Sequence, residues 1–304
     1  MSHTWTLTKI RMKLALRTRA FLFFSLVMPV AFLFLYAGVF GRGDPHFISY
    51  MLASVLALTV MGSFWGLSVQ LVMFRERGIL RRFRVAPVGP GAMLASSMIS
   101  NYFLTLPTVV LEFLLARWIF HLPQWGNLWG VWVLVTLGTA TFAALGLIIA
   151  SVTNTLQETQ VINNAIWFVF LFLSGATLPL PMLPGWIQRV ALFLPATYLV
   201  TGLQKVLLLS SPTRELGAEI ASLVGCTAVA FVMSLQLFRW EPEEKVPARA
   251  KAWAAATIIP FLLLGIWEST AGQRLGKARM IFYSLEKTAP SDKSRPAPSK
   301  NLFP

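Results

Sequence analysis

The sequence predicts an all-α, polytopic membrane protein with six transmembrane helices. Of its 304 residues, 56% are hydrophobic and only 12% are charged, whereas a soluble domain carries about 25% charged residues. The mean hydropathy is +0.66. The apolar residues also gather in six long runs, each of about the 20 residues that a helix needs to cross the hydrocarbon core of a bilayer.

The six predicted spans are the framework of residues 20–240, which we interpret as one membrane domain. They cover residues 20–40, 46–74, 93–120, 128–152, 161–180 and 220–238. The first two contain no charged residue, and the third contains Glu112 and Arg117. A seventh run, 252–267, has 16 residues with Pro260 near its middle, so it would make only a short span.

Residues 1–19, before the first span, are predicted to form a cytoplasmic interfacial helix. Three basic residues recur at intervals of four on one face of such a helix: Lys9, Lys13 and Arg17. Because Lys and Arg are attracted to anionic headgroups, we interpret the helix as resting on the membrane surface. A specific docking role for the same helix is the alternative.

The charges predict the orientation of the chain. The 26 Lys and Arg outnumber the 12 Asp and Glu, which gives a net charge of +14 and in a soluble protein would suggest nucleic acid. With the N-terminus in the cytoplasm, fourteen basic residues fall on inner segments, five on outer segments and seven in the C-terminal tail. Cytoplasmic loops hold an excess of Lys and Arg. The distribution therefore favours a cytoplasmic N-terminus and leaves no basic face for nucleic acid.

Residues 241–304 are predicted to form a C-terminal extension. If the run 252–267 crosses the membrane, the seven basic residues of the tail lie outside, against the charge rule. If it does not cross, the flanking Trp253 and Trp267 favour a place in the interface or against the other helices. Both possibilities stay open. The last stretch, 288–304, has four prolines and no apolar periodicity, so we expect it to be disordered.

The loop between the second and third runs, residues 75–90, is richer in arginine and bulky apolar residues than an ordinary polar loop. Apolar anchors among arginines suit a short helix that lies in a groove of another protein. The alternative is that the arginines only set the topology. The candidate docking residues in this loop are Arg75, Glu76, Arg77, Gly78, Leu80, Arg81, Arg82, Phe83 and Pro87.

The stretch after the fifth run contains Pro179, Pro181 and Pro184 within six residues. Each proline removes a backbone donor, so a helix does not continue through them. Non-helical backbone at membrane depth is tolerated only where protein or a water-filled cavity satisfies it. The stretch is therefore either a partly re-entrant segment on the outer side or an ordinary outer loop.

Two motif regions resemble the type-2 ATP-binding-cassette (ABC) transporter permease family. Glu76-Arg77, followed by Leu80 and Pro87, is similar to the family's cytoplasmic loop between helices two and three. The succession after the fifth run is similar to the family's partly re-entrant outer segment, in the residues Ser174, Gly175, Pro179, Pro184, Trp186, Pro195 and Tyr198. The resemblance covers about residues 1–240, and the tail has no counterpart in it.

The resemblance implies a permease subunit of an exporter in the plasma (bacterial inner) membrane. It would pair as a homodimer or heterodimer, contact membrane lipid and be driven by a separate ABC ATPase subunit that docks on residues 75–87, with the outer succession as a gate. The sequence has no G-x-x-x-x-G-K-[ST] phosphate-binding loop. We therefore expect this chain to be no enzyme and to bind no cofactor, with ATP and Mg²⁺ bound by the partner. An amphipathic or lipid-like substrate, or a drug, would move by alternating access.

Polar residues inside the predicted spans are candidates for a transport role. Glu112 is an acid well inside an apolar run, where an ionisable group is a functional candidate by default. The alternative is that Glu112 lies near the interface and pairs locally with Arg117. Asn163 and Asn164 near the start of the fifth span could line an inner vestibule, although solvated helix ends have the same composition.

Two other classes of function compete with a permease. An ion- or proton-coupled secondary carrier could use Glu112, but the paired broken helices of such folds are not evident in the sequence. A membrane-embedded lipid-modifying enzyme needs a nucleophile with a base, paired acids or a metal set. The three scattered histidines and the single Cys226 offer no such cluster, so we expect neither catalytic residues nor a metal.

Overall fold

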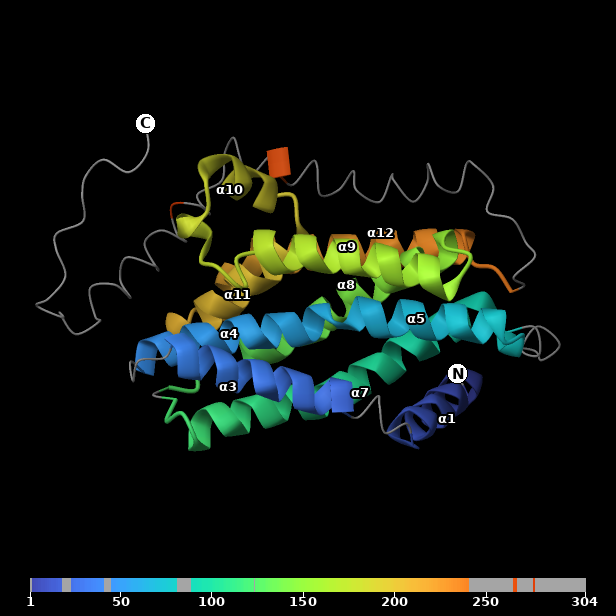
Figure 1. Ribbon diagram of the computed structural model, residues 1–304, viewed down its shortest axis with the longest axis horizontal. Helices are drawn as coiled ribbons and strands as arrows, with labels where there is room; N and C mark the ends of the chain where they lie inside the picture. The colour runs from blue at the N-terminus through green and yellow to red at the C-terminus, as the bar shows by residue number, and fades with distance from the viewer. Residues whose placement is uncertain are drawn as a thin grey trace, which may run out of the picture.

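The computed structural model describes residues 2–17, 23–40, 45–80, 89–122 and 124–240, together with residues 265, 266 and 276. Over these residues the chain is helical, with turns between the helices and no β-strand, as the sequence predicts. Figure 1 shows the long helices lying side by side, so that the bundle has two well-separated ends.

Four helical stretches are long and apolar enough to cross a membrane. They are α4 with α5 (Pro45–Met61 and Ser63–Glu76), α7 (Pro90–Trp118), α8 (Leu128–Val152) and η3 with α12 (Thr213–Leu216 and Gly217–Gln236). They correspond to the second, third, fourth and sixth predicted spans. The prediction of a multi-pass membrane protein is therefore confirmed at this coarser level.

The first and fifth predicted spans form shorter helices. The first consists of a five-residue π-helical piece, η1 (Phe23–Val27), and of α3 (Met28–Phe40). The fifth is α9 (Leu156–Leu173), which begins and ends earlier than the predicted run 161–180. A total of six spans thus stays a prediction. Apart from residues 265 and 266, the run 252–267 lies outside the described residues, as does the stretch 288–304.

Helix α1 (Ser2–Arg17) lies along the first half of α7 and is held there by one buried face. Thr8 is fully buried, and its carbonyl accepts a hydrogen bond from Ser100 Oγ at 3.4 Å. Arg11 is also buried and donates to Ser97 Oγ and to Met93 Sδ. Burial lowers the pKa of Arg11 to about 10, so the guanidinium still carries its charge at neutral pH. The helix is thus docked on the bundle. The predicted row of basic residues is exposed: Lys9, Lys13 and Arg17.

Helix α8 is central to the bundle, because α4, α5, α7, α11 and α12 all pack against it. Two glycines allow the closest of these approaches. A Cβ atom at Gly146 would lie 2.4 Å from the carbonyl oxygen of Phe64. A Cβ atom at Gly138 would lie within 3 Å of side-chain atoms of both Leu199 and Val60. Because glycine has no side chain, α8 can lie this close to α4, α5 and α11 at these two positions.

The segment between α9 and α12 contains two helices, α10 and α11, that meet at a sharp angle. The short helices η2 (Leu180–Met182) and α10 (Gly185–Ala191) are followed by α11 (Pro195–Leu208), and α10 meets α11 at 95°. Leu199 packs on Gly138 in the middle of α8, whereas Val206 packs on Gly130 near its start. Helix α11 therefore runs from the middle of the bundle out to the end where α8 begins (Figure 1).

The bundle has two ends. The arginine end is the one where α5 ends, α9 begins and Arg239 lies. The far end is the opposite one, where α7 ends, α8 begins and α11 ends. Helix α1 lies near the arginine end in Figure 1.

Candidate coupling and transport sites

At the arginine end, Arg75 turns into the bundle. Its guanidinium is buried and donates to the carbonyl oxygen of Ala150 at 2.8 Å and to that of Thr153 at 2.6 Å. These carbonyls belong to the last turn of α8, where helix geometry leaves acceptors without an intrahelical partner. A cation there also interacts favourably with the helix dipole. Arg75 therefore caps α8.

Arg239, just after α12, binds the same helix end. Its guanidinium donates to the carbonyl oxygens of Ser151 at 3.0 Å and Thr153 at 2.7 Å, and to Asn154 Oδ1 at 3.1 Å. The carbonyl oxygen of Thr153 thus accepts hydrogen bonds from both arginines. Two segments that are distant in sequence meet at the C-terminus of α8.

Glu76 binds the next helix, α9, at its first turn. Its Oε1 atom accepts a hydrogen bond from the Leu156 backbone N–H at 2.8 Å. The side chain of Thr155 caps the same turn by accepting from the Glu158 N–H at 3.1 Å. Glu158 in turn accepts from the Asn154 N–H at 2.7 Å. Free backbone donors and the helix dipole both favour carboxylates at a helix N-terminus.

The residues of the predicted docking loop therefore have different environments. Arg75 is buried and hydrogen-bonded to α8, so we assign it a structural role inside the subunit. Glu76 and Arg77 are exposed at the end of α5. Gly78 has φ +66°, a conformation that favours glycine, and Leu80 is buried against the bundle. Four of the predicted residues lie outside the described residues: Arg81, Arg82, Phe83 and Pro87.

The polar residues inside the helices occupy three different environments. Glu112 is fully buried and accepts a hydrogen bond from Thr59 Oγ1 on α4. Its expected local partner Arg117 instead donates to the Leu122 carbonyl oxygen, so the local pairing is wrong. Asn163 is buried on α9 and donates to Ser68 Oγ on α5 at 2.8 Å, whereas Asn164 is exposed.

Helix α9 has few buried side chains and a long exposed face. Its buried residues are Thr159, Asn163 and Phe170. The exposed face carries Asn164 towards the arginine end and two aromatic residues further along, Phe168 and Phe172, whose rings stack with centroids 6.3 Å apart. An exposed polar group followed by aromatic groups is an amphipathic surface.

The predicted outer gate residues lie between the end of α9 and the first turn of α11. Gly175 has φ +86°, and its carbonyl oxygen accepts from Tyr50 Oη at 3.5 Å. The buried hydroxyl of Tyr198 donates to the carbonyl oxygen of Leu192 at 2.9 Å and thus ties α11 to the end of α10. The remaining predicted residues are buried Ser174, which accepts from the Ala176 N–H, Pro179 before η2, Pro184 before α10, exposed Trp186, and Pro195 at the start of α11.

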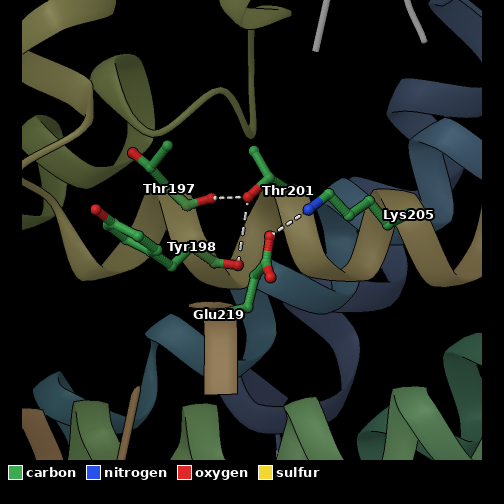
Figure 2. A network of polar contacts seen from close by, with 5 residues as sticks. All are labelled: Thr197, Tyr198, Thr201, Lys205 and Glu219. Carbon is green, nitrogen blue, oxygen red and sulfur yellow. Dashed lines mark hydrogen bonds and ion pairs between the residues drawn. The ribbon is translucent and has the colours of Figure 1, made fainter. Parts of the chain in front are cut away.

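An ion pair joins α11 to α12, and its acid was missed by the sequence reasoning. Lys205 Nζ lies 2.6 Å from Glu219 Oε1, and Glu219 is fully buried. Figure 2 shows the two side chains meeting beside Thr201, whose hydroxyl donates to the carbonyl oxygen of Thr197 at 2.8 Å. The pair therefore fixes the far end of α11 to the first turn of α12.

Two further features of the arginine end were also missed. The charge count recorded Arg239 only as a topology signal, although it is the first charged residue after the last apolar run. The sequence Thr155-x-x-Glu158 is a capping signature that marks the start of α9. No group of three or more His, Cys, Asp or Glu able to hold a metal occurs within the described part of the chain.

Comparison with known proteins gives the following similarities. The profile of a family described as ABC-2 type transporter matches residues 2–208. The putative transport permease YvfS of Bacillus subtilis (strain 168) is 25% identical over 209 residues, which are 66% of this chain and 84% of that protein. The linearmycin resistance permease protein LnrN of the same organism is 25% identical over 182 residues, 60% of this chain and 47% of that protein. The daunorubicin resistance ABC transporter permease protein DrrB1 of Streptomyces coeruleorubidus is 25% identical over 225 residues, 70% of this chain and 77% of that protein.

Proposed function

Because the chain belongs to the ABC-2 type transporter family, we propose that it is the permease subunit of an ATP-driven exporter that moves an amphipathic or lipid-like compound or drug by alternating access. The family match over residues 2–208 carries this proposal. The partner is an ABC ATPase subunit, and ATP with Mg²⁺ binds to that partner. The subunit lies in the bacterial inner membrane with its N-terminus and arginine end in the cytoplasm.

The ATPase is proposed to dock on the segment that starts at Glu76. Glu76 and Arg77 are exposed at the end of α5, and the sequence continues with further arginines and Phe83. Arginine and aromatic residues supply much of the contact energy of protein interfaces. Arg75 is excluded from the contact surface because its guanidinium is buried on α8.

The exposed face of α9 is proposed to border the transport path in a permease dimer. A polar side chain such as Asn164 is unfavourable against lipid. Because Asn164 is exposed in one subunit, we propose that a second subunit or a water-filled path supplies the hydrogen-bond partners of its amide. The aromatic residues Phe168 and Phe172 continue this face. Together they suit a substrate with both polar and apolar parts.

The segment from η2 to α11 is proposed to be a re-entrant outer gate. Helix α11 begins in the middle of the bundle, is almost entirely buried, and meets α10 at 95°. Backbone of this kind is tolerated at membrane depth where protein surrounds it. Trp186, 68% exposed on α10, marks the outer surface of the gate.

The substrate class is proposed from the relatives and the α9 face together. One relative is named for linearmycin resistance and another for daunorubicin resistance. We therefore propose daunorubicin as a first probe.

A reconstitution experiment tests the proposed function. The chain is co-expressed with candidate ABC ATPases, purified through a tag and placed in vesicles, where ATP-dependent uptake of daunorubicin is measured. We expect an ATPase to co-purify and its hydrolysis to be stimulated by the permease. Uptake that needs a proton gradient and no ATPase would contradict the proposal.

A charge reversal tests the docking segment within that system. Arg77→Glu should lower ATPase co-purification and ATP-dependent uptake by about tenfold, the effect of losing roughly 1.4 kcal/mol at an interface. The matched control is Arg214→Glu, a reversal at an exposed arginine near the start of α12. Equal losses in both variants would exclude docking on this segment.

A proton-coupled carrier is the second candidate function, and Glu112 is the observation that favours it. The carboxyl is fully buried in the bundle and has Thr59 as its hydrogen-bond partner. Glu112→Gln keeps the size of the side chain but cannot carry a proton. Loss of uptake in this variant, with ATP hydrolysis intact and uptake following a pH gradient, would support the carrier.

A further inference from the structure

The α8–α9 turn is held by two consecutive residues of α5. Arg75 donates to carbonyl oxygens at the end of α8, and Glu76 accepts from the first N–H of α9. Each charge has the sign that its helix end attracts, positive at a C-terminus and negative at an N-terminus. The turn of three residues, Thr153 to Thr155, is therefore attached to the end of α5 on both sides, by Arg75 before it and by Glu76 after it.

Arg239 extends this connection to the segment after α12. It shares the Thr153 carbonyl oxygen with Arg75 and also holds Asn154. Four hydrogen bonds from two guanidinium groups reach the last carbonyls of α8. The planar arginine fork fixes direction as well as distance. The two arginines therefore fix the direction of the α8 C-terminus as well as satisfying its free carbonyl oxygens.

The link adds to a small set of contacts that position the first turns of α9, which include packing by Leu156 and a hydrogen bond from Thr159 Oγ1 to Thr153 Oγ1 at 2.8 Å. Of its residues, only Thr159, Asn163 and Phe170 are buried in the described structure. Asn163 makes a hydrogen bond to Ser68, again on α5. Both the first turn of α9 and its buried amide are therefore attached to α5.

We propose that Arg75 and Glu76 are positioning residues of the coupling step, which make the α8–α9 turn follow any displacement of the end of α5. This inference rests on the proposed function, in which an ATPase pushes or pulls the segment that starts at Glu76. The movement then passes through the turn into α9 and its exposed face. Arg239 carries the same movement to the end of α12.

One backbone substitution breaks the link without touching the docking segment. Leu156 is the first residue of α9, after the N-cap Thr155. Proline is tolerated at this position, where its fixed φ suits the helix. Thr155 has φ −121° and ψ 159°, which the residue before a proline readily adopts. Leu156→Pro therefore removes the N–H that Glu76 accepts, and Leu156→Ala is the control that shortens the side chain but keeps the N–H.

The test measures daunorubicin transported per ATP hydrolysed in vesicles that contain permease and ATPase. We expect Leu156→Pro and Glu76→Gln to lower this ratio about three- to tenfold, as the loss of a charge-assisted hydrogen bond does to an equilibrium, and Leu156→Ala to leave it unchanged. The double variant should be no worse than the more affected single variant, because both break one contact.

The outcomes separate this inference from the proposed function. If wild-type vesicles show no ATP-dependent uptake, the proposed function fails. If wild type transports but Leu156→Pro keeps its ratio, or lowers uptake and hydrolysis in equal proportion, the positioning role is wrong and the contact only stabilises the fold. Losses that multiply in the double variant would also overturn it.

Discussion

At the level of single residues, the ion pair between Lys205 and Glu219 is a test of how α11 is held. Glu219 is fully buried, so replacing Lys205 removes the cation that its carboxylate pairs with. Breaking a buried pair costs about 3–5 kcal/mol. We expect Lys205→Met to lower the melting temperature of the detergent-purified protein strongly. Lys205→Met with Glu219→Gln should recover part of the loss, because it removes both charges.

The result that would contradict this prediction is a double variant less stable than Lys205→Met alone. Stability would then depend on contacts of the Glu219 carboxylate other than the ion pair. Thermal unfolding followed by intrinsic tryptophan fluorescence gives the measurement.

Residue roles at the arginine end show where sequence reasoning stops. The charge pattern placed Arg75 and Glu76 in one predicted docking loop, but it could not distinguish an arginine that faces a partner from one that faces its own bundle. Burial separates them, since Arg75 caps α8 while Glu76 is exposed. Glu112 is similar, because its partner Thr59 is distant in sequence.

At the level of helices, the packing of α8 on α5 depends on Gly146. A Cβ atom there would meet the backbone of Phe64 at 2.4 Å, and backbone cannot rotate away. Overpacking of this kind costs typically about 1–3 kcal/mol, so Gly146→Ala should lower the melting temperature. Gly225→Ala on α12 is the matched control, because no atom lies within 4 Å of its new methyl group.

For the control, replacing a helical glycine by alanine should be neutral or stabilising by up to about 1 kcal/mol. An equal drop in melting temperature for both variants would show that close approach at Gly146 is not responsible. The comparison uses one substitution type in two helices of the same protein.

The sequence predicted the long apolar helices well, and it predicted the shorter or partly polar helices α9 and α11 less well. The long apolar runs of α7 and α8 predicted both helices to within three residues, because their mean hydropathy is high over more than 20 residues. Helix α9 was placed too late, since its first turns are polar and are stabilised by Thr155 and Glu76 rather than by apolar burial. Helix α11 was counted as outer loop because it is short and contains polar residues such as Gln204, whose burial becomes evident only in the folded bundle.

At the level of the whole molecule, the orientation in the membrane can be tested with the chain's one cysteine removed. Cys226 is buried, so Cys226→Ala gives a background for single new cysteines. Gln157→Cys lies on the exposed first turn of α9 at the arginine end, and Trp186→Cys lies on α10. A membrane-impermeant maleimide added to intact cells should label Trp186→Cys only.

Labelling of Gln157→Cys from outside would reverse the proposed topology, and with it the cytoplasmic docking of the ATPase. Permeabilised cells serve as the control in which both positions react. The experiment tests the positive-inside argument directly, since that argument depends on counts of Lys and Arg and not on any single residue.

The neighbouring charges of Arg75 and Glu76 also determine which motions of α5 are possible. The arginine meets carbonyl oxygens and the glutamate meets an N–H group, so a slip of α5 by one residue would bring a carboxylate against carbonyl oxygens. Sliding and axial rotation of α5 are therefore opposed by like-sign repulsion at both helix ends. We therefore expect α5 to tilt about the α8–α9 turn, a motion that can keep both contacts, and not to slide or rotate about its own axis.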